Sequence, residues 1–278
     1  MAEWNLIIDL GKCHDCNNCM MACKDEFVDN DWPPYSAAQP NHGHRWMNIM
    51  RREGGQYPKV EVAYLPRPCQ HCEDAPCVAE SKDGAVYRRD DGIVLIDPEK
   101  AKGQKEIVDS CPYGSIFWNE EKALPQKCTL CVHLLEDGWK QPRCVQACPT
   151  GALTAVCVGK TELDNMIKTD KLEVYRPELN TKPRVLYKNL ALFTKGFIAG
   201  SVAEKDNDEC AEGAEVTLIQ TPDNKIGVTA TNNYGDFKFH GLAENSGEYR
   251  IEIEYPGRDN KSVSFDFKTS MNLGTIFV

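Results

Sequence analysis

Cysteine is the residue type whose number and spacing in this sequence could do chemistry. The chain has 278 residues and fourteen cysteines. Twelve of them lie in four groups: Cys13, Cys16, Cys19 and Cys23; Cys69, Cys72 and Cys77; Cys111; and Cys128, Cys131, Cys144 and Cys148. Disulfide frameworks are typical of small secreted chains, whereas this chain is large and its first eleven residues are too short and acidic for a secretion signal. We therefore expect the grouped thiolates to bind metal.

The spacing predicts iron–sulfur clusters and divides the ligands among them. The first group reads C-x2-C-x2-C-x3-C, in which three cysteines bind one 4Fe–4S cluster and the fourth binds a neighbouring cluster. This rule gives three complete sets, called here the first, second and third sets: Cys13, Cys16, Cys19 and Cys148; Cys23, Cys128, Cys131 and Cys144; and Cys69, Cys72, Cys77 and Cys111. The first two sets form one ferredoxin-like pair.

The partner of the third set is missing. It would need three cysteines shortly before Cys111, and residues 98–110 contain none. It would also need a cysteine four positions after Cys77, where Ser81 stands. Both halves of a fourth site are absent together, so the sequence predicts three 4Fe–4S clusters on twelve ligands.

Zinc is the alternative metal. Structural zinc sites typically use two C-x2-C pairs for each ion, and triplets followed by a lone Cys-Pro do not fit that pattern. The spacing therefore favours iron. Cys157 and Cys210 remain outside the sets, and we expect them to be inert buried thiols.

Other chemistry-bearing residues do not form a site. His14, His71 and His133 lie within or beside the ligand loops and could tune a cluster through hydrogen bonds to sulfur. We expect them instead to satisfy the loop backbone and not to bind metal. The sequence shows no nucleophile with a paired base, no phosphate-binding loop and no acid/base dyad, so we predict no catalytic residue on this chain.

The composition excludes several classes of protein. The chain is 41% apolar and 27% charged, as is ordinary for a globular protein. Its net charge of −10 argues against binding nucleic acid or an anionic membrane through the overall field. No stretch approaches the roughly 18 apolar residues that span a bilayer. We expect a reducing cytoplasm, although a cofactor-bearing subunit can also be exported with a partner that carries the signal.

The pattern changes along the chain. Residues 1–195 hold the twelve grouped cysteines and predict a tandem ferredoxin-like domain, with a short strand at 93–96 and a connector at 170–195. Residues 196–278 instead alternate apolar and polar side chains, most strictly at 249–255, with turn residues between the runs. We count about seven short strands there, so the sequence predicts an α+β protein that ends in a β-sandwich.

Several motifs resemble known families. The four-group cysteine layout resembles the iron–sulfur subunits of molybdopterin oxidoreductases related to dimethyl sulfoxide reductase. A narrower resemblance is to the small, or beta, subunits of pyrogallol–phloroglucinol transhydroxylase (pyrogallol hydroxytransferase). It rests on the segments 13–19 (CHDCNNC), 42–49 (HGHRWMNI), 92–103 (GIVLIDPEKAKG), 111–114 (CPYG) and 181–185 (TKPRV).

The narrower resemblance implies an assembly. Such subunits carry three clusters and a transthyretin-like sandwich, and form a heterodimer with a large subunit that holds Mo-bis(molybdopterin guanine dinucleotide). The implied role is electron transfer during conversion of pyrogallol to phloroglucinol, without activity of this chain alone. The cluster of Cys13, Cys16, Cys19 and Cys148 is then the one nearest molybdenum. Loss of the fourth cluster implies no membrane anchor.

Three alternatives stay open. The chain could serve a sister enzyme such as a resorcinol hydroxylase or catechol dehydroxylase. It could serve a respiratory reductase, which predicts a membrane partner. It could also be a free polyferredoxin whose sandwich serves adhesion or carbohydrate binding.

The ligand arithmetic makes a first prediction. Freshly purified protein should contain about twelve irons and an equal amount of acid-labile sulfide per chain, because three four-iron clusters use all twelve grouped cysteines. Metal analysis measures this directly. A reproducible count near sixteen irons, or stoichiometric zinc, would contradict the assignment.

Overall fold

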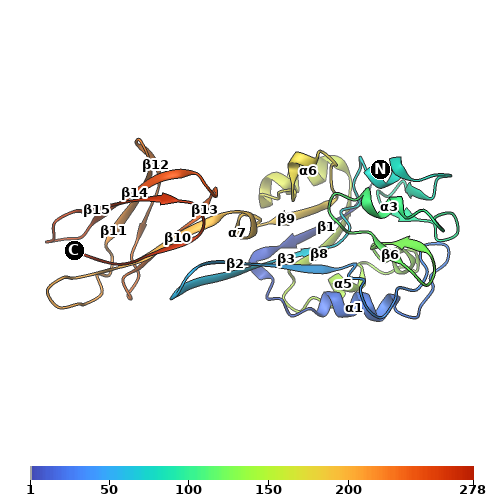
Figure 1. Ribbon diagram of the computed structural model, residues 1–278, viewed down its shortest axis with the longest axis horizontal. Helices are drawn as coiled ribbons and strands as arrows, with labels where there is room; N and C mark the ends of the chain where they lie inside the picture. Colours follow the sequence, from blue (N-terminus) through green and yellow to red (C-terminus); the bar gives the residue numbers. More distant parts are fainter. Residues whose placement is uncertain (1) are drawn as a thin grey trace. The chain divides into compact units, whose positions relative to one another are not determined.

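The computed structural model describes residues 2–278 and divides into two units. The first unit comprises residues 2–50 and 64–190, and the second comprises 51–63 and 191–278. Figure 1 shows the elements of both units in sequence colours.

A three-stranded sheet forms the frame of the first unit. Its central strand is β1 (Glu3–Asp9), which pairs antiparallel with β8 (Leu153–Val158) and parallel with β9 (Val185–Lys188). Leu6 and Ile8 on β1 are almost completely buried. Strand β1 thus joins the start of the cysteine region to its end and to the predicted connector.

Short elements hold the cysteine loops between these strands. The hairpins are β4 (Val86–Arg88) with β5 (Val94–Ile96) and β6 (Phe117–Asn119) with β7 (Leu124–Gln126). The helices of the first unit are α1 (Asn18–Phe27), α2 (Pro76–Glu80), α3 (Glu106–Asp109), α4 (Val132–Glu136), α5 (Arg143–Gln146) and α6 (Lys160–Asp170), with single 3₁₀ turns at Leu10–Lys12 and Pro177–Leu179. Strand β5 confirms the short strand expected at 93–96, and its residues are buried.

Two sheets form the second unit. One has the strand order β13–β10–β16 and the other the order β12–β11–β14–β15. Their bounds are β10 (Gly196–Ala203), β11 (Glu215–Gln220), β12 (Asn224–Ala230), β13 (Asp236–Leu242), β14 (Gly247–Glu254), β15 (Lys261–Phe267) and β16 (Met271–Phe277). Strand β14 confirms the alternating strand expected at 249–255. Its inward side chains, such as Ile251, share one hydrophobic core with Ile198 of β10 and Val216 of β11.

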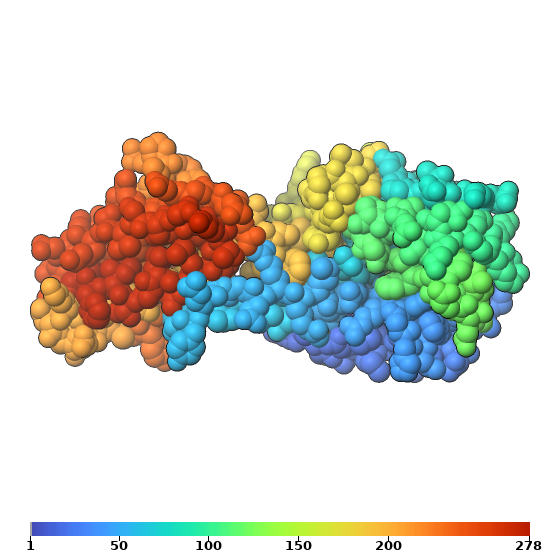
Figure 2. Space-filling model, in the orientation of Figure 1, coloured from blue at the N-terminus to red at the C-terminus, as the bar shows by residue number. Residues whose placement is uncertain are grey.

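The second unit also contains a segment that the sequence boundary at residue 196 left out. Strands β2 (Asn48–Gln56) and β3 (Lys59–Arg67) form a hairpin whose tip, residues 51–63, belongs to this unit. Lys59 forms an ion pair with Asp236, and Lys238 forms one with Glu61. Figure 2 shows this tip in light blue against the orange-red surface of β10 to β16. The charged residues in these two ion pairs lie more than 170 positions apart in the sequence, so no local sequence pattern indicated their contact.

Gly55 allows the tip to approach β10 closely. Its φ is +89°, which side chains other than glycine rarely adopt. A Cβ built there would lie 2.6 Å from the ring of Phe197 and 2.2 Å from the carbonyl oxygen of Lys59. Glycine is therefore required at this position of the hairpin.

No helix within residues 2–278 is long and apolar enough to cross a membrane.

The shared core of the second unit makes a prediction about stability. Phe267 is completely buried, so Phe267→Ala should lower the free energy of unfolding of this unit by about 3–5 kcal/mol through lost burial and the cavity left behind. Denaturant-dependent hydrogen exchange of peptides from β11 and β14 measures it. Tyr234→Ala is the control, because Tyr234 is 69% exposed and should change stability by no more than about 0.5 kcal/mol. Equal effects of the two changes would contradict this account of the core.

Candidate metal centres

The first C-x2-C turn of each cysteine group that contains one has the same backbone conformation. In the turns 13–16, 69–72 and 128–131, the residue before the second cysteine has a left-handed φ: Asp15 at 56°, His71 at 44° and Leu130 at 54°. This conformation is uncommon outside glycine and costs free energy, so its recurrence indicates a shared constraint. The turn points the backbone N–H back at the first sulfur. The N–H of His71 donates to Sγ of Cys69 at 3.5 Å, and that of Leu130 donates to Sγ of Cys128 at 3.3 Å.

The two Cys-Pro loops repeat a second pattern. Cys111 and Cys148 are each followed by proline, one variable residue and a glycine, and both glycines have a left-handed φ, 59° at Gly114 and 64° at Gly151. The N–H of Ser115 donates to Sγ of Cys111 at 3.4 Å. Backbone hydrogen bonds in the equivalent loop also reach Cys148, and its pKa is lowered by them and by the Thr150 hydroxyl although burial acts to raise it. N–H to sulfur bonds of this kind set the properties of iron–sulfur clusters.

The third set lines one cavity. Its four cysteines surround an empty volume of about 330 Å³ together with Val94, Tyr113 and Ile116. Burial raises the pKa of Cys72 to about 12, and the other three thiols of the set act in the same direction. The structure therefore brings together four thiols that the sequence assigned to one set.

The first and second sets gather in the same way. Burial raises the pKa of Cys19 to about 12, and the other three thiols of the first set contribute. Burial also raises the pKa of Cys144, and the other three thiols of the second set act in the same direction. Cys19 and Cys23, which the crossing rule assigns to different sets, lie one turn apart on helix α1 and are both buried.

The donor chemistry of these sets fits a polynuclear cluster. All fourteen cysteines carry free thiols. Buried thiols that suppress one another's ionisation become thiolates when cations lie among them. Within residues 2–278, no three His, Cys, Asp or Glu side chains converge closely enough to hold a single metal ion. The sulfurs of the third set instead lie around a cavity, which is the arrangement that a cluster of several irons needs.

Buried donors beside the sulfurs also fit such a group. Nδ1 of His71 accepts the N–H of Val94 at 3.1 Å, which leaves the proton of this neutral ring on Nε2. Nε2 is buried and has no hydrogen-bond partner among the described residues, and neither has the hydroxyl of Thr129. Buried donors are rarely left unpaired. Both lie in C-x2-C turns, where the sulfur of a bound cluster could accept.

The sets differ in exposure. Cys16 of the first set is exposed, and Cys13 and Cys148 are half-buried. In the second and third sets, by contrast, three of the four cysteines are buried. The first set therefore lies closest to solvent.

The two remaining cysteines correct one expectation. Cys157 and Cys210 were expected to be buried, and both are exposed. Cys157 lies on β8 opposite Trp4, with its side chain away from the core, and Cys210 lies in a loop that forms an isolated bridge with Ala203. Alternation along an edge strand and a loop position account for their exposure.

The histidines take different roles. His71 satisfies the backbone N–H of Val94, as expected. Nε2 of His133 lies 2.9 Å from Oε1 of Glu26, and its ring stacks on Trp32 with centroids 4.3 Å apart. These contacts fix helix α4 against α1.

The predicted connector reaches back to the third set, which sequence reasoning missed. The hydroxyl of Thr181 forms hydrogen bonds with Cys72 and, at 2.8 Å, with the hydroxyl of Tyr113. The N–H of Asp74 donates to the carbonyl oxygen of Thr181 at 3.1 Å, and the N–H of Arg184 donates to that of Gln70 at 2.9 Å. The motif at 181–185 was a signal, but nothing in it indicated which loop it would contact.

Side chains fill the region where a fourth set would lie. Oγ of Ser81 donates to the carbonyl oxygen of Val78 at 3.1 Å and accepts the N–H of Val86 at 3.2 Å. Ala101 and Ile107 are completely buried in one core cluster with Cys77. Local packing therefore takes the place of ligands here.

Comparison with known proteins agrees with this geometry. A family model described as a 4Fe-4S dicluster domain matches residues 60–157. A carboxypeptidase regulatory-like domain matches residues 198–271. The fold and the cysteine sets thus define an iron–sulfur protein with an added β-domain.

Individual relatives identify the family within this class of iron–sulfur proteins. The pyrogallol hydroxytransferase small subunit of Pelobacter acidigallici is 47% identical over 279 residues, which cover 96% of this chain and 99% of that protein. A subunit of the tetrathionate reductase of Salmonella typhimurium is 33% identical over 68% of this chain and 73% of its own length. A subunit of the anaerobic dimethyl sulfoxide reductase of Escherichia coli is 32% identical over 54% of this chain and 72% of its own length. The chain belongs to the family of the pyrogallol hydroxytransferase small subunit, within the iron–sulfur subunits related to dimethyl sulfoxide reductase.

The geometry predicts which cluster, if any, each single cysteine substitution affects. Cys111→Ser should remove or alter only the cluster of the third set, because Cys111 lines only that cavity. Cys157→Ser and Cys210→Ser are the controls and should leave iron content unchanged, since both thiols lie outside the sets. Iron analysis and electron paramagnetic resonance of the reduced variants measure this. Loss of a cluster signal in Cys210→Ser would show that the sets are wrongly assigned.

Proposed function

We propose that this chain is the electron-transfer subunit of a molybdenum hydroxytransferase that acts on polyhydroxylated benzenes and converts pyrogallol to phloroglucinol. The observation that carries the proposal is 47% identity along almost the whole length of both chains. The two reductase subunits match only 54% and 68% of this chain. The match to the hydroxytransferase subunit therefore extends over the second unit as well, which favours this enzyme over a respiratory reductase.

Three 4Fe–4S clusters form part of the proposal, on the first, second and third sets. Supporting this are the repeated left-handed turns, the N–H to sulfur bonds and the shared cavity of the third set. Bound clusters would supply one-electron transfer, while the chain fixes their sulfurs and excludes water from them. Cysteine sets that span both ends of the first unit allow electrons to cross it.

The direction of transfer follows from exposure and packing. We assign the first set to the position nearest the partner's molybdenum, because Cys16 is exposed. The third set lies at the other end, where Ser81, Ala101 and Ile107 occupy the place of a further set. A chain of clusters that stops there has no exit toward a membrane quinone. This suits hydroxyl transfer between two phenols, which consumes no net electrons.

The remaining parts of the proposal concern assembly. We propose a cytoplasmic heterodimer with a large subunit that holds Mo-bis(molybdopterin guanine dinucleotide), without a membrane anchor. Catalysis then belongs to the large subunit, and this chain alone is inactive. We propose that the second unit is a transthyretin-like, seven-stranded sandwich that serves assembly. Its apolar side chains form a core and its charged side chains form ion pairs, and neither group supplies a cluster of reactive residues.

Co-expression with the large subunit tests the proposal. The wild-type complex should convert pyrogallol to phloroglucinol after reductive activation, and neither subunit should do so alone. Cys16→Ser should slow activation more than the matched change Cys72→Ser, since the first set lies between molybdenum and the rest of the clusters.

Iron content of each complex controls for loss of assembly. Activity from this chain alone would overturn the proposal. Equal activation of all three complexes would remove the proposed order of the clusters. Turnover of resorcinol or catechol in place of pyrogallol would identify a sister enzyme instead.

A further inference from the structure

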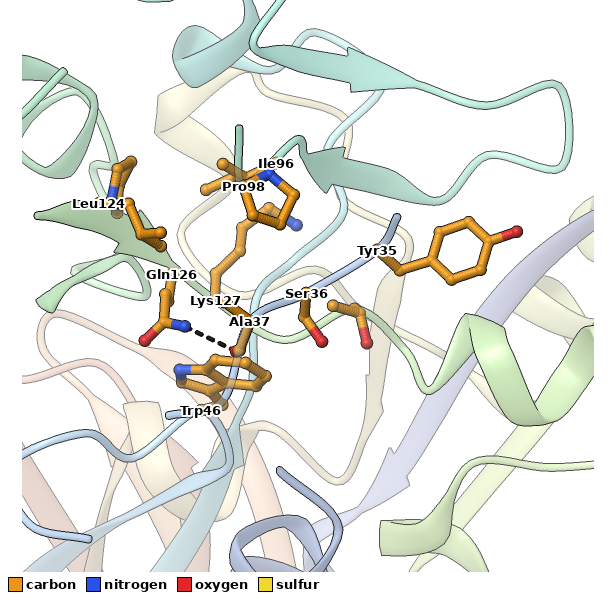
Figure 3. A pocket seen from close by; sticks show the side chains of 11 residues that line it. Tyr35, Ser36, Ala37, Trp46, Ile96, Pro98, Leu124, Gln126 and Lys127 are labelled. Carbon is orange, nitrogen blue, oxygen red and sulfur yellow. Dashed lines mark hydrogen bonds between the residues drawn. The ribbon is translucent and has the colours of Figure 1, made fainter. Parts of the chain in front are cut away.

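Lys127 is a buried cation between two of the ligand sets. It follows β7 and directly precedes Cys128 of the second set, and it is only 2% exposed. Its stem lies in the same pocket as Trp46, Ile96 and Pro98, all labelled in Figure 3. The ammonium is thus held within the first unit, away from water.

The partners of the ammonium are carbonyl oxygens. Nζ donates to the carbonyl oxygen of Val94 and, at 3.1 Å, to that of Cys128. Among residues 2–278, no carboxylate forms an ion pair with it. Arg184 is also buried but differs, because it pairs with Glu3 at 2.7 Å. Lys127 is therefore a buried charge that the carboxylates of the described residues do not neutralise.

Val94 connects this charge to the third set. Its carbonyl oxygen accepts from Lys127, its N–H donates to His71, and its side chain lines the cavity of the third set. Through its hydrogen bonds to the carbonyl oxygens of Val94 and Cys128, the ammonium lies beside the third set and the second set respectively.

A buried ammonium without a carboxylate needs another anion. Four thiolates around a 4Fe–4S core carry net negative charge, and reduction adds one more electron. A nearby fixed cation favours the more negative state, and net charge is among the factors that set the potential of a cluster. His71 is neutral, because its Nδ1 accepts the N–H of Val94 and therefore carries no proton. Lys127 is then the cation that acts on this site.

We propose that Lys127 raises the reduction potential of the third set's cluster, and to a lesser degree that of the second, so that the inner end of the chain of clusters retains an electron. This inference rests on the cluster assignment of the proposed function. It makes the third set an electron store, and Lys127 a positioning residue that acts through charge. A store is useful where the overall reaction is redox-neutral, because an electron borrowed from the metal must be available for return.

The test uses the full-length chain purified anaerobically with its accompanying subunit. Lys127→Met removes the charge at similar length, Lys127→Gln keeps a hydrogen-bond donor without charge, and Lys127→Arg keeps the charge. Lys122→Met is the matched control, because Lys122 lies between β6 and β7, its side chain is 36% exposed, and it pairs with the Asp31 carboxylate. Redox titrations followed by electron paramagnetic resonance report each cluster, with the signals assigned from Cys111→Ser and Cys16→Ser.

The expected result is specific to position. In Lys127→Met and Lys127→Gln, the ratio of reduced to oxidised third-set cluster at fixed potential should fall at least tenfold, which is about 59 mV for one electron. The second set should shift less and the first set not at all. Lys127→Arg and Lys122→Met should match the wild type.

Two results would overturn the inference. One is a change below tenfold at the third set, or an equal shift at all three sets, in both neutral variants. The other is loss of the third cluster in both neutral variants, which would make Lys127 structural. A wild-type protein without three clusters would instead refute the proposed function, so the two failures are distinguishable by iron content.

Discussion

The need to bury sulfur ligands that must also be charged governs the first unit. A buried thiolate is unfavourable unless cations and hydrogen bonds compensate it. The chain provides backbone N–H groups for this purpose, aimed by left-handed residues such as His71 and Leu130 in the C-x2-C turns. Leucine and histidine gain nothing by themselves from that conformation, so its cost must be offset by what the turn holds. The surrounding strands and helices keep these turns in place.

The same constraint gives the proposed chain of clusters two different ends. The first set meets solvent at Cys16, where a partner can approach. The third set is enclosed by Val94, Tyr113 and the segment that begins at Thr181. The Lys127 ammonium donates a hydrogen bond to the carbonyl oxygen of Val94. Low exposure strengthens the effect of a nearby charge because water does not screen it. One end is therefore suited to exchange and the other to retention.

Local patterns predicted well where neighbours in sequence determine the structure. The cysteine spacing, the strand at 94–96 and the alternating strands β13 to β15 follow from residues a few positions apart. The roles of Thr181 and Lys127 depend on loops far away in the chain, and so does membership of the hairpin tip 51–63 in the second unit. The exposure of Cys157 was missed because thiols are usually buried, whereas its place on an edge strand decides the outcome.

The absence of a fourth ligand set involves more than the replacement of cysteines by other residues. A cysteine at position 81 would replace a hydroxyl that caps Val78 and Val86, yet three more ligands would still be needed within residues 98–110. That segment now contains helix α3 and contributes Ala101 and Ile107 to the core beside Cys77. Gln104 closes it further, since its side chain accepts the N–H of Lys82 at 2.9 Å and donates to the carbonyl oxygen of Lys100 at 2.8 Å. Close packing leaves no space for a cluster without rebuilding the segment. The hydrophobic core therefore defines the end of the proposed chain of clusters, and single cysteine substitutions in this segment would not extend it.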